Sequence, residues 1–139
     1  MEQPKKIRGF LVRTADKLIQ RILELSRRPE LRDEGEPAPA QQVIEQAIQL
    51  IRDADGLMLE MPSGQVSVFF GEVNVTWRAG DRIVRLACFP NRPSVIQTGC
   101  LSLPLGSYRS EPNPTGQLLA ARLESLVQDN DPEEPSFLG

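Results

Sequence analysis

Three arginines around one predicted turn, preceded by a tryptophan, are the residues of this chain best suited to chemistry. Arg78 comes just before the turn, and Arg82 and Arg85 follow it. Arginine side chains hold phosphate and an aromatic ring stacks on a base, so the cluster is a candidate for contact with nucleic acid. The alternative is a solvated hairpin whose arginines pair with nearby carboxylates. With the basic residues of an upstream helix, the candidate set is Arg13, Lys17, Arg21, Trp77, Arg78, Arg82 and Arg85.

Motifs for the commonest enzymes and metal sites are missing. The chain has no histidine, which removes Ser-His-Asp and Cys-His catalysis. Its two cysteines, Cys88 and Cys100, form no CxxC pair, and we interpret them as reduced thiols, with a disulfide as the alternative. The glycines are isolated at turns, so no phosphate-binding loop is present. We therefore expect no catalytic residue, no metal and no cofactor.

Carboxylate, lysine or tyrosine chemistry stays possible without histidine, and the enzyme hypothesis that we consider uses carboxylates alone. Glu60, Glu72 and Asp81 lie at predicted strand ends, where acids from different strands can converge. Carboxylates beside turns are more often solvated or bonded to the backbone. The hypothesis requires all three side chains to share one cleft.

Charge is distributed unevenly along the chain. Residues 1–28 contain eight basic and three acidic residues, a balance of +5, whereas residues 29–139 contain eight and sixteen, a balance of −8. Residues 1–28 also carry an apolar stripe at helical spacing, which predicts a basic amphipathic helix. This helix either packs in the protein's own core, docks on a partner, or lies on an anionic membrane or nucleic acid. The candidate partner-binding residues are Ile7, Leu11, Leu18, Ile22 and Leu25.

Composition shifts divide the chain into four segments. The basic helix of residues 1–28 is followed by an acidic, Pro- and Gly-containing connector over 29–39, which we expect to separate it from the rest. Residues 40–128 have the pattern of an α+β domain, and the acidic tail over 129–139 is predicted to be disordered.

Alternating apolar and polar residues identify the central architecture. Helices are predicted over about 40–54 and 116–128, and strands over 57–61, 65–70, 72–77, 82–89 and within 94–103, with 104–116 as a loop. Both faces of the strand over 82–89 are apolar, so it should be central. The sequence therefore predicts an α+β fold with an antiparallel β-meander of 4–6 strands, helices on one face, and the order helix, helix, meander, helix.

The segment from Gly71 to Leu86 resembles a hairpin of small uncharacterised bacterial proteins in which a helix precedes a short meander. The resemblance covers about residues 40–90 and implies no catalytic residues. It favours a bacterial accessory protein.

The chain is typical of one ordinary globular domain, with 139 residues and 40% hydrophobic residues. It has neither a secretory signal pattern nor a membrane-spanning run, so we expect a cytoplasmic protein. The leading hypothesis is a non-enzymatic accessory or adaptor subunit that binds a protein partner or forms a homo-oligomer. A nucleic-acid-contacting module is the second, and an enzyme that uses carboxylates alone is the third.

Overall fold

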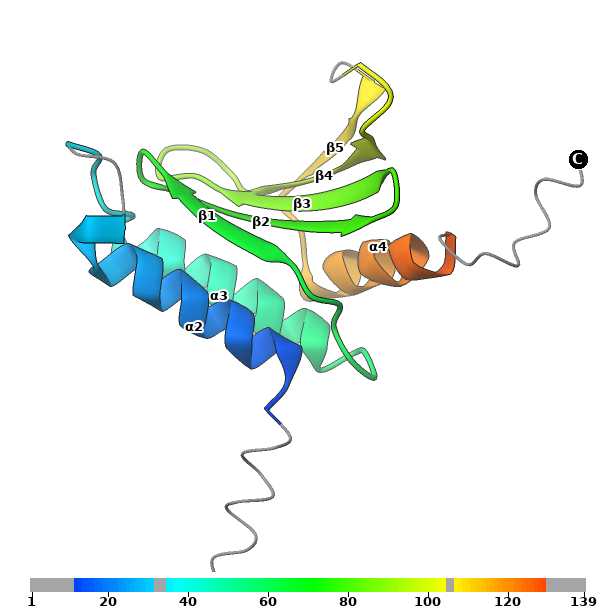
Figure 1. Cartoon of the computed structure of the whole chain (residues 1–139), viewed down its shortest axis with the longest axis horizontal. Coiled ribbons are helices and arrows are strands. Elements are labelled where there is room, and N and C mark those ends of the chain that lie inside the picture. Colours follow the sequence, from blue (N-terminus) through cyan, green and yellow to red (C-terminus); the bar gives the residue numbers. More distant parts are fainter. Residues whose placement is uncertain (1–11, 32–34, 105–106, 130–139) are drawn as a thin grey trace, which may run out of the picture.

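A computed structural model describes residues 12–31, 35–104 and 107–129 of the chain (Figure 1). Two helices come first, five strands follow, and a helix closes the order, which confirms the predicted α+β class. The elements are α2 (Thr14–Arg27), η1 (Pro29–Leu31), α3 (Gln41–Asp55), β1 (Gln65–Phe69), β2 (Glu72–Ala79), β3 (Arg82–Cys88), β4 (Val95–Cys100), β5 (Arg109–Pro112) and α4 (Gly116–Asp129).

The sheet is an antiparallel meander in which every strand pairs with its neighbours in sequence. The spatial order is β1-β2-β3-β4-β5, so β3 is central, as its two apolar faces predicted. Two-residue turns join the first three strands, with Phe69 opposite Glu72 and Ala79 opposite Arg82. The strands β1 and β5 form the two edges of the sheet.

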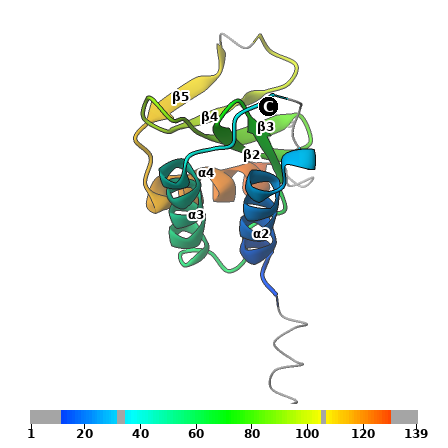
Figure 2. The same ribbon diagram turned by 90° about the vertical axis from the view of Figure 1, so that its left-hand side faces the viewer.

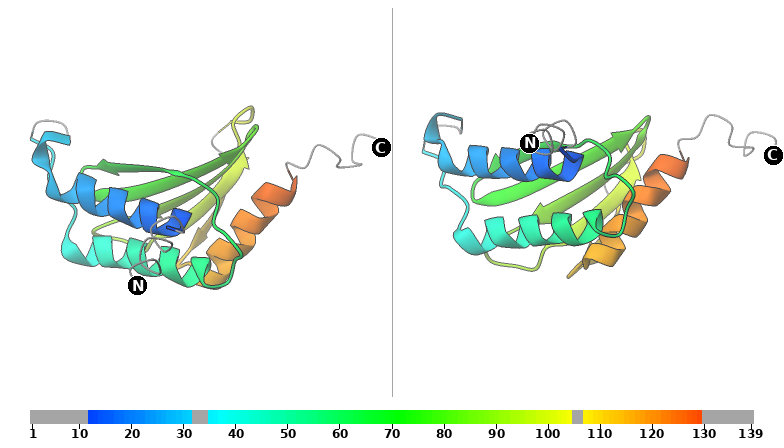
Figure 3. Two further views of the ribbon diagram at one scale, coloured as in Figure 1. Left: turned by 60° about the horizontal axis from the view of Figure 1, so that its bottom comes forward. Right: turned by 90° about the horizontal axis from the view of Figure 1, so that it is seen from below.

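The α-helices of the described residues, α2, α3 and α4, all cover the same face of the sheet (Figures 2 and 3). The helices α2 and α3 lie side by side beneath β1 to β3, and α4 lies beneath β2 and β3 at the other end. Alternation along β2 sends Val73, Val75 and Trp77 toward the helices, where all three are fully buried. On the opposite face β2 carries the polar side chains of Asn74, Thr76 and Arg78, whereas Ile83 and Ala87 of β3 are buried there.

The basic first helix is part of this core. Residues Ala15, Leu18, Ile19 and Ile22 of α2 belong to the same hydrophobic cluster as α3, α4 and the sheet. Arg13 fixes the start of α2, because Nε and Nη2 of its side chain donate to the two carboxylate oxygens of Asp55, each at 2.8 Å. The connector that we expected to separate this helix therefore joins two parts of one folded unit, and Glu36 within it is buried. The predicted disordered tail lies outside the described residues, apart from Asp129 at the end of α4.

The sheet differs from its prediction at both ends. Residues 57–61 are not a strand, because the N–H groups of Leu57 and Met58 donate to the last carbonyls of α3 and continue the helix as turns.

Residues 109–112, predicted as loop, form β5. Tyr108, just before β5, places its ring directly over Gly99 of β4, where a Cβ would lie 2.5 Å from the ring. The aromatic ring thus covers the glycine and helps to hold a strand of polar composition.

Candidate functional site

Among the described residues, no strand pairs with the outer edge of β1, and this edge of the sheet is called the open edge. In a two-residue hairpin the residues next to the turn exchange hydrogen bonds, and antiparallel pairing then alternates. Phe69, Ser67 and Gln65 therefore use their backbone groups toward β2, whereas the N–H and C=O groups of Val66 and Val68 point away from the sheet. The structure thus presents two donors and two acceptors in the spacing that one further strand requires.

The composition of β1 leaves this edge unprotected. Natural sheets block exposed edges with charged residues, proline, bulges or a covering element. The sequence of β1, Gln-Val-Ser-Val-Phe, contains neither a charge nor a proline. The next residue, Phe70, is also apolar. An uncharged edge of this kind is suited to pairing with a strand from another chain.

A groove runs beside β1 on the helix side of the sheet. One stripe of α2 and the residues leading into β1 enclose a volume of about 330 Å³. Lys17 and Arg21 lie in its wall with Leu18 between them, and among the described residues the wall contains no carboxylate. A strand added to β1 would direct every second side chain toward this apolar and basic groove.

A shallow hollow lies beside β1 on the opposite face of the sheet, with a volume of about 450 Å³. Ser67 and Phe69 of β1 line it together with Asn74, Thr76 and Arg85. The Nε of Arg85 donates to the hydroxyl of Thr76 at 3.4 Å. The alternate side chains of an added strand would lie in this second, more polar hollow.

Two phenylalanines form the end of the β1–β2 hairpin. Phe69 and Phe70 are 54% and 56% exposed, and their rings meet edge to face at 4.6 Å. Phe70 has a φ of 49° and Gly71 a φ of 84°, the pattern of a type I′ turn. Such turns favour Asn, Asp or Gly at the first position, so a phenylalanine there carries backbone strain. The backbone N–H of Phe70 donates to the buried Glu36 carboxylate at 2.6 Å, which holds the turn in place.

Trp77 positions the start of β1. Its indole N–H donates to the carbonyl oxygen of Pro62 at 2.9 Å. Gly64 lies against the same indole, where a Cβ would approach Nε1 to 2.9 Å. The fully buried ring therefore fixes the segment that enters β1 and one wall of the groove, and it has no free face on which a base could stack.

The apolar stripe of the first helix is not the surface that the sequence suggested. Leu18, Ile22 and Leu25 are at most 7% exposed, because α3 and the sheet already cover them. Ile7 and Leu11 lie outside the described residues. An isolated amphipathic helix and a packed one have the same periodicity, so the sequence could not distinguish the two arrangements.

The predicted nucleic-acid set is spread over several surfaces. Arg78 and Arg85 lie on the open face of the sheet, and the register sends Arg82 to the helix face. Arg13 pairs with Asp55, and Lys17 and Arg21 line the groove beside β1. Arg78 stands opposite Ile83 in the register of β2 and β3. The described residues of this set therefore form no common basic surface.

The three carboxylates do not converge. Glu72 begins β2 and Asp81 follows its end, so roughly 25 Å of extended chain separates them. Asp81 accepts a hydrogen bond from Ser102, and Glu60 accepts one from Thr14. These contacts place the three acids in different surroundings, which removes the basis of the carboxylate enzyme hypothesis.

The two cysteines also lie apart. Cys88 ends β3, whereas Cys100 stands opposite Arg82 at the beginning of that strand. Six residues of extended chain, about 20 Å, far exceed the Cα separation of a disulfide. Burial raises the pKa of the Cys88 thiol. Both cysteines are free thiols, as predicted.

One sequence signal for the open edge was available. The run from Gln65 to Phe70 has no charge, and it is followed by a tight turn whose first residue is not Asn, Asp or Gly. What the sequence could not show is that β1 would be an edge strand, since that depends on whether residues 57–61 pair with it.

Comparisons with protein-family models, with curated proteins and with solved structures found no match to this chain. The resemblance to small bacterial proteins therefore stays a prediction. No helix among the described residues is both long enough and apolar enough to cross a membrane.

Proposed function

We propose that this protein is a protein-binding accessory subunit that captures an extended segment of its partner as an additional strand beside β1. The observation that carries the proposal is the uncharged edge of β1, with the backbone groups of Val66 and Val68 directed away from the sheet. Main-chain hydrogen bonds would supply affinity, and the grooves on the two faces would select alternate side chains.

The chemistry around β1 indicates what the partner segment contains. Lys17 and Arg21 favour an acidic residue on the helix side, with Leu18 beside them for an apolar one. Phe69 and Phe70 offer exposed rings where the strand ends, and aromatic residues are frequent anchors of protein interfaces. The expected ligand is an extended segment that alternates apolar and polar residues and carries at least one carboxylate.

A peptide selection tests this proposal directly. A displayed library of random peptides is selected on the intact protein, and bound peptides are mapped by amide hydrogen exchange. We expect exchange protection at Val66 and Val68, whose N–H groups point away from the sheet in the free protein, and binding that Val68→Pro weakens about 30- to 100-fold. Peptides that bind the Val68→Pro variant as well as the parent protein would contradict strand addition.

Purification of the tagged protein from its native host tests whether it binds a protein partner in the cell. The parent protein and the Val68→Pro variant are compared, each with and without nuclease. A stoichiometric protein that survives nuclease and is lost only from the variant would support the accessory role. Loss of every associated molecule on nuclease treatment would favour nucleic acid instead.

A further inference from the structure

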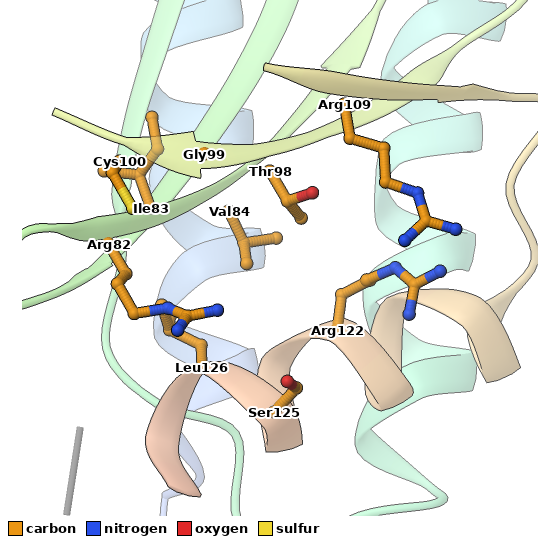
Figure 4. A pocket seen from close by; sticks show the side chains of 10 residues that line it. All are labelled: Arg82, Ile83, Val84, Thr98, Gly99, Cys100, Arg109, Arg122, Ser125 and Leu126. Carbon is orange, nitrogen blue, oxygen red and sulfur yellow. The ribbon is translucent and has the colours of Figure 1, made fainter. Parts of the chain in front are cut away.

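The last turn of α4 is fixed in place and exposes an apolar residue. Figure 4 shows Arg122 of α4 beside Arg109 of β5, and both guanidinium groups are directed at the carboxylate of Glu111. The fully buried Leu123 anchors the same helix in the core. One turn further on, Val127 is 52% exposed. A rigid helix end thus presents an apolar side chain to the outside.

A hollow of about 290 Å³ lies between this helix end and the turns that follow α3. Val127 forms part of its wall together with Met58 and Leu59, and Leu59 is 98% exposed. Single exposed leucines are common on protein surfaces, but here three apolar residues from two elements line one hollow. Covering them would remove apolar surface from water, which is favourable.

The rim of this hollow is negatively charged. Among the described residues that line it, Glu60 and Glu124 are carboxylates and none is basic. Both are exposed, and Glu60 accepts a hydrogen bond from the hydroxyl of Thr14 through Oε2 at 3.3 Å. Apolar surface beside two carboxylates suits a ligand that combines apolar side chains with positive charge.

The chain itself supplies a segment of this chemistry beside the hollow. Residues 1–11 contain three basic residues and one acidic residue, and three of their apolar side chains are large. The basic residues are Lys5, Lys6 and Arg8, and the large apolar residues in question are Ile7, Phe10 and Leu11. The segment joins the described chain just before Arg13, whose Nη2 donates to the carbonyl oxygen of Leu59 at 2.9 Å. Eleven residues reach at most about 36–40 Å, so the hollow is well within range.

We propose that residues 1–11 dock in this hollow of their own chain. Their apolar side chains would lie against Leu59 and Val127, and their basic side chains near the two carboxylates. Ile7 and Leu11, two candidate partner-binding residues of the sequence, would then contact the protein itself. The hollow shares no lining residue with the groove beside β1, so this proposal and the proposed strand addition can fail separately.

Nuclear magnetic resonance of the whole protein tests the docking directly. We expect nuclear Overhauser contacts between the ring of Phe10 and the methyl groups of Leu59 or Val127, and Phe10→Ser should shift those methyl signals. The matched control is Phe137→Ser, which removes the same ring from residues 130–139 and should leave the signals unchanged. Absence of the contacts, their loss on dilution, or methyl signals that respond only to Phe137→Ser would overturn the proposal.

A charge substitution tests the match between the basic segment and the rim. Glu124→Gln should lower the ratio of docked to free segment about two- to fivefold at low salt and very little at high salt, the range of an exposed ion pair. The Leu59 methyl shift reports this ratio, with Phe10→Ser giving the free position. The matched control, Glu45→Gln, removes an exposed carboxylate of α3 outside the hollow and should have no effect. Equal responses to the two substitutions would overturn the assignment of the basic segment.

Discussion

The two edges of the sheet are built in opposite ways. The edge strand β5 is four residues long, carries Arg109 and Glu111, ends at Pro112, and is tied to α4 by the Glu111–Arg122 pair. The edge strand β1 has no charge and no proline, and Val66 and Val68 direct their backbone groups outward. One edge is thus protected against further pairing by its short length, its charges and its proline, whereas the other has neither a charged residue nor a proline.

The difference indicates where association with another chain takes place. Exposed edges promote aggregation, and β5 shows that this fold has the means to protect an edge. An open β1 beside two grooves and two exposed phenylalanines is therefore best explained by a segment that pairs with it. The strained backbone at Phe70 supports the same interpretation, because strain is retained where a side chain serves a function.

The largest expected effect comes from proline substitution at neighbouring positions of β1. Val68→Pro removes an N–H that points away from the sheet, so we expect a cost of about 1 kcal/mol in folding and a 30- to 100-fold loss of peptide binding. Ser67→Pro removes an N–H that β2 uses and should cost about 3 kcal/mol or more. Urea denaturation and peptide titration separate the two effects. Equal destabilisation by both substitutions would mean that the assigned register is wrong.

A substitution at the β5 edge should change the stability of the protein but not its binding of a peptide. Glu111→Gln breaks a partly buried, two-pronged ion pair and should lower the free energy of unfolding by about 1–2 kcal/mol, with peptide binding at β1 unchanged. Hydrogen exchange should report the loosening at β5. A change in peptide affinity would show that the two edges are coupled.

Low pH should cause the same loss of stability as Glu111→Gln. The hydrogen bond from Arg122 lowers the pKa of Glu111, so the folded protein binds that proton more weakly than the unfolded chain does. The stabilisation is therefore fully present above the ordinary glutamate pKa of about 4.3, and it is lost as pH falls through the lower pKa of the folded state. Denaturation curves of the parent and of Glu111→Gln should converge in that range. A constant difference down to pH 2 would contradict this assignment.

Substitution at the hairpin turn should separate stability from binding. Phe70→Asn places a residue that tolerates positive φ at this position, so we expect a gain of about 1 kcal/mol in stability. The same change removes an exposed ring and should weaken peptide binding about tenfold. Phe70→Ala is the control, because it removes the ring but keeps the strain. If binding is unaffected by both substitutions, the rings are not anchors.

The smallest effect should come from charge in the groove beside β1. Lys17→Gln should weaken binding of an acidic peptide about threefold at low salt and very little at high salt, since exposed charges are screened. Arg27→Gln, on the same helix but outside the groove, should change nothing. Peptide titrations at two salt concentrations decide between these outcomes.

Much of the fold was predictable because local pattern determines it. Alternation identified β2 and β3, and the apolar faces of β3 placed it at the centre. Periodicity also identified α2, but not that the sheet would cover Leu18 and Ile22. The open edge was beyond prediction, because it depends on the absence of long-range pairing.

The strict meander also has a consequence for how the chain is made. Because each strand pairs only with its neighbours in sequence, the sheet can grow hairpin by hairpin as the chain emerges. The buried face of α2 has to wait for β1, which begins 38 residues after α2 ends. At about 5–20 residues per second, synthesis of that interval takes roughly 2–8 s. During this time the apolar stripe of α2 is available to a chaperone, as it never is in the finished protein.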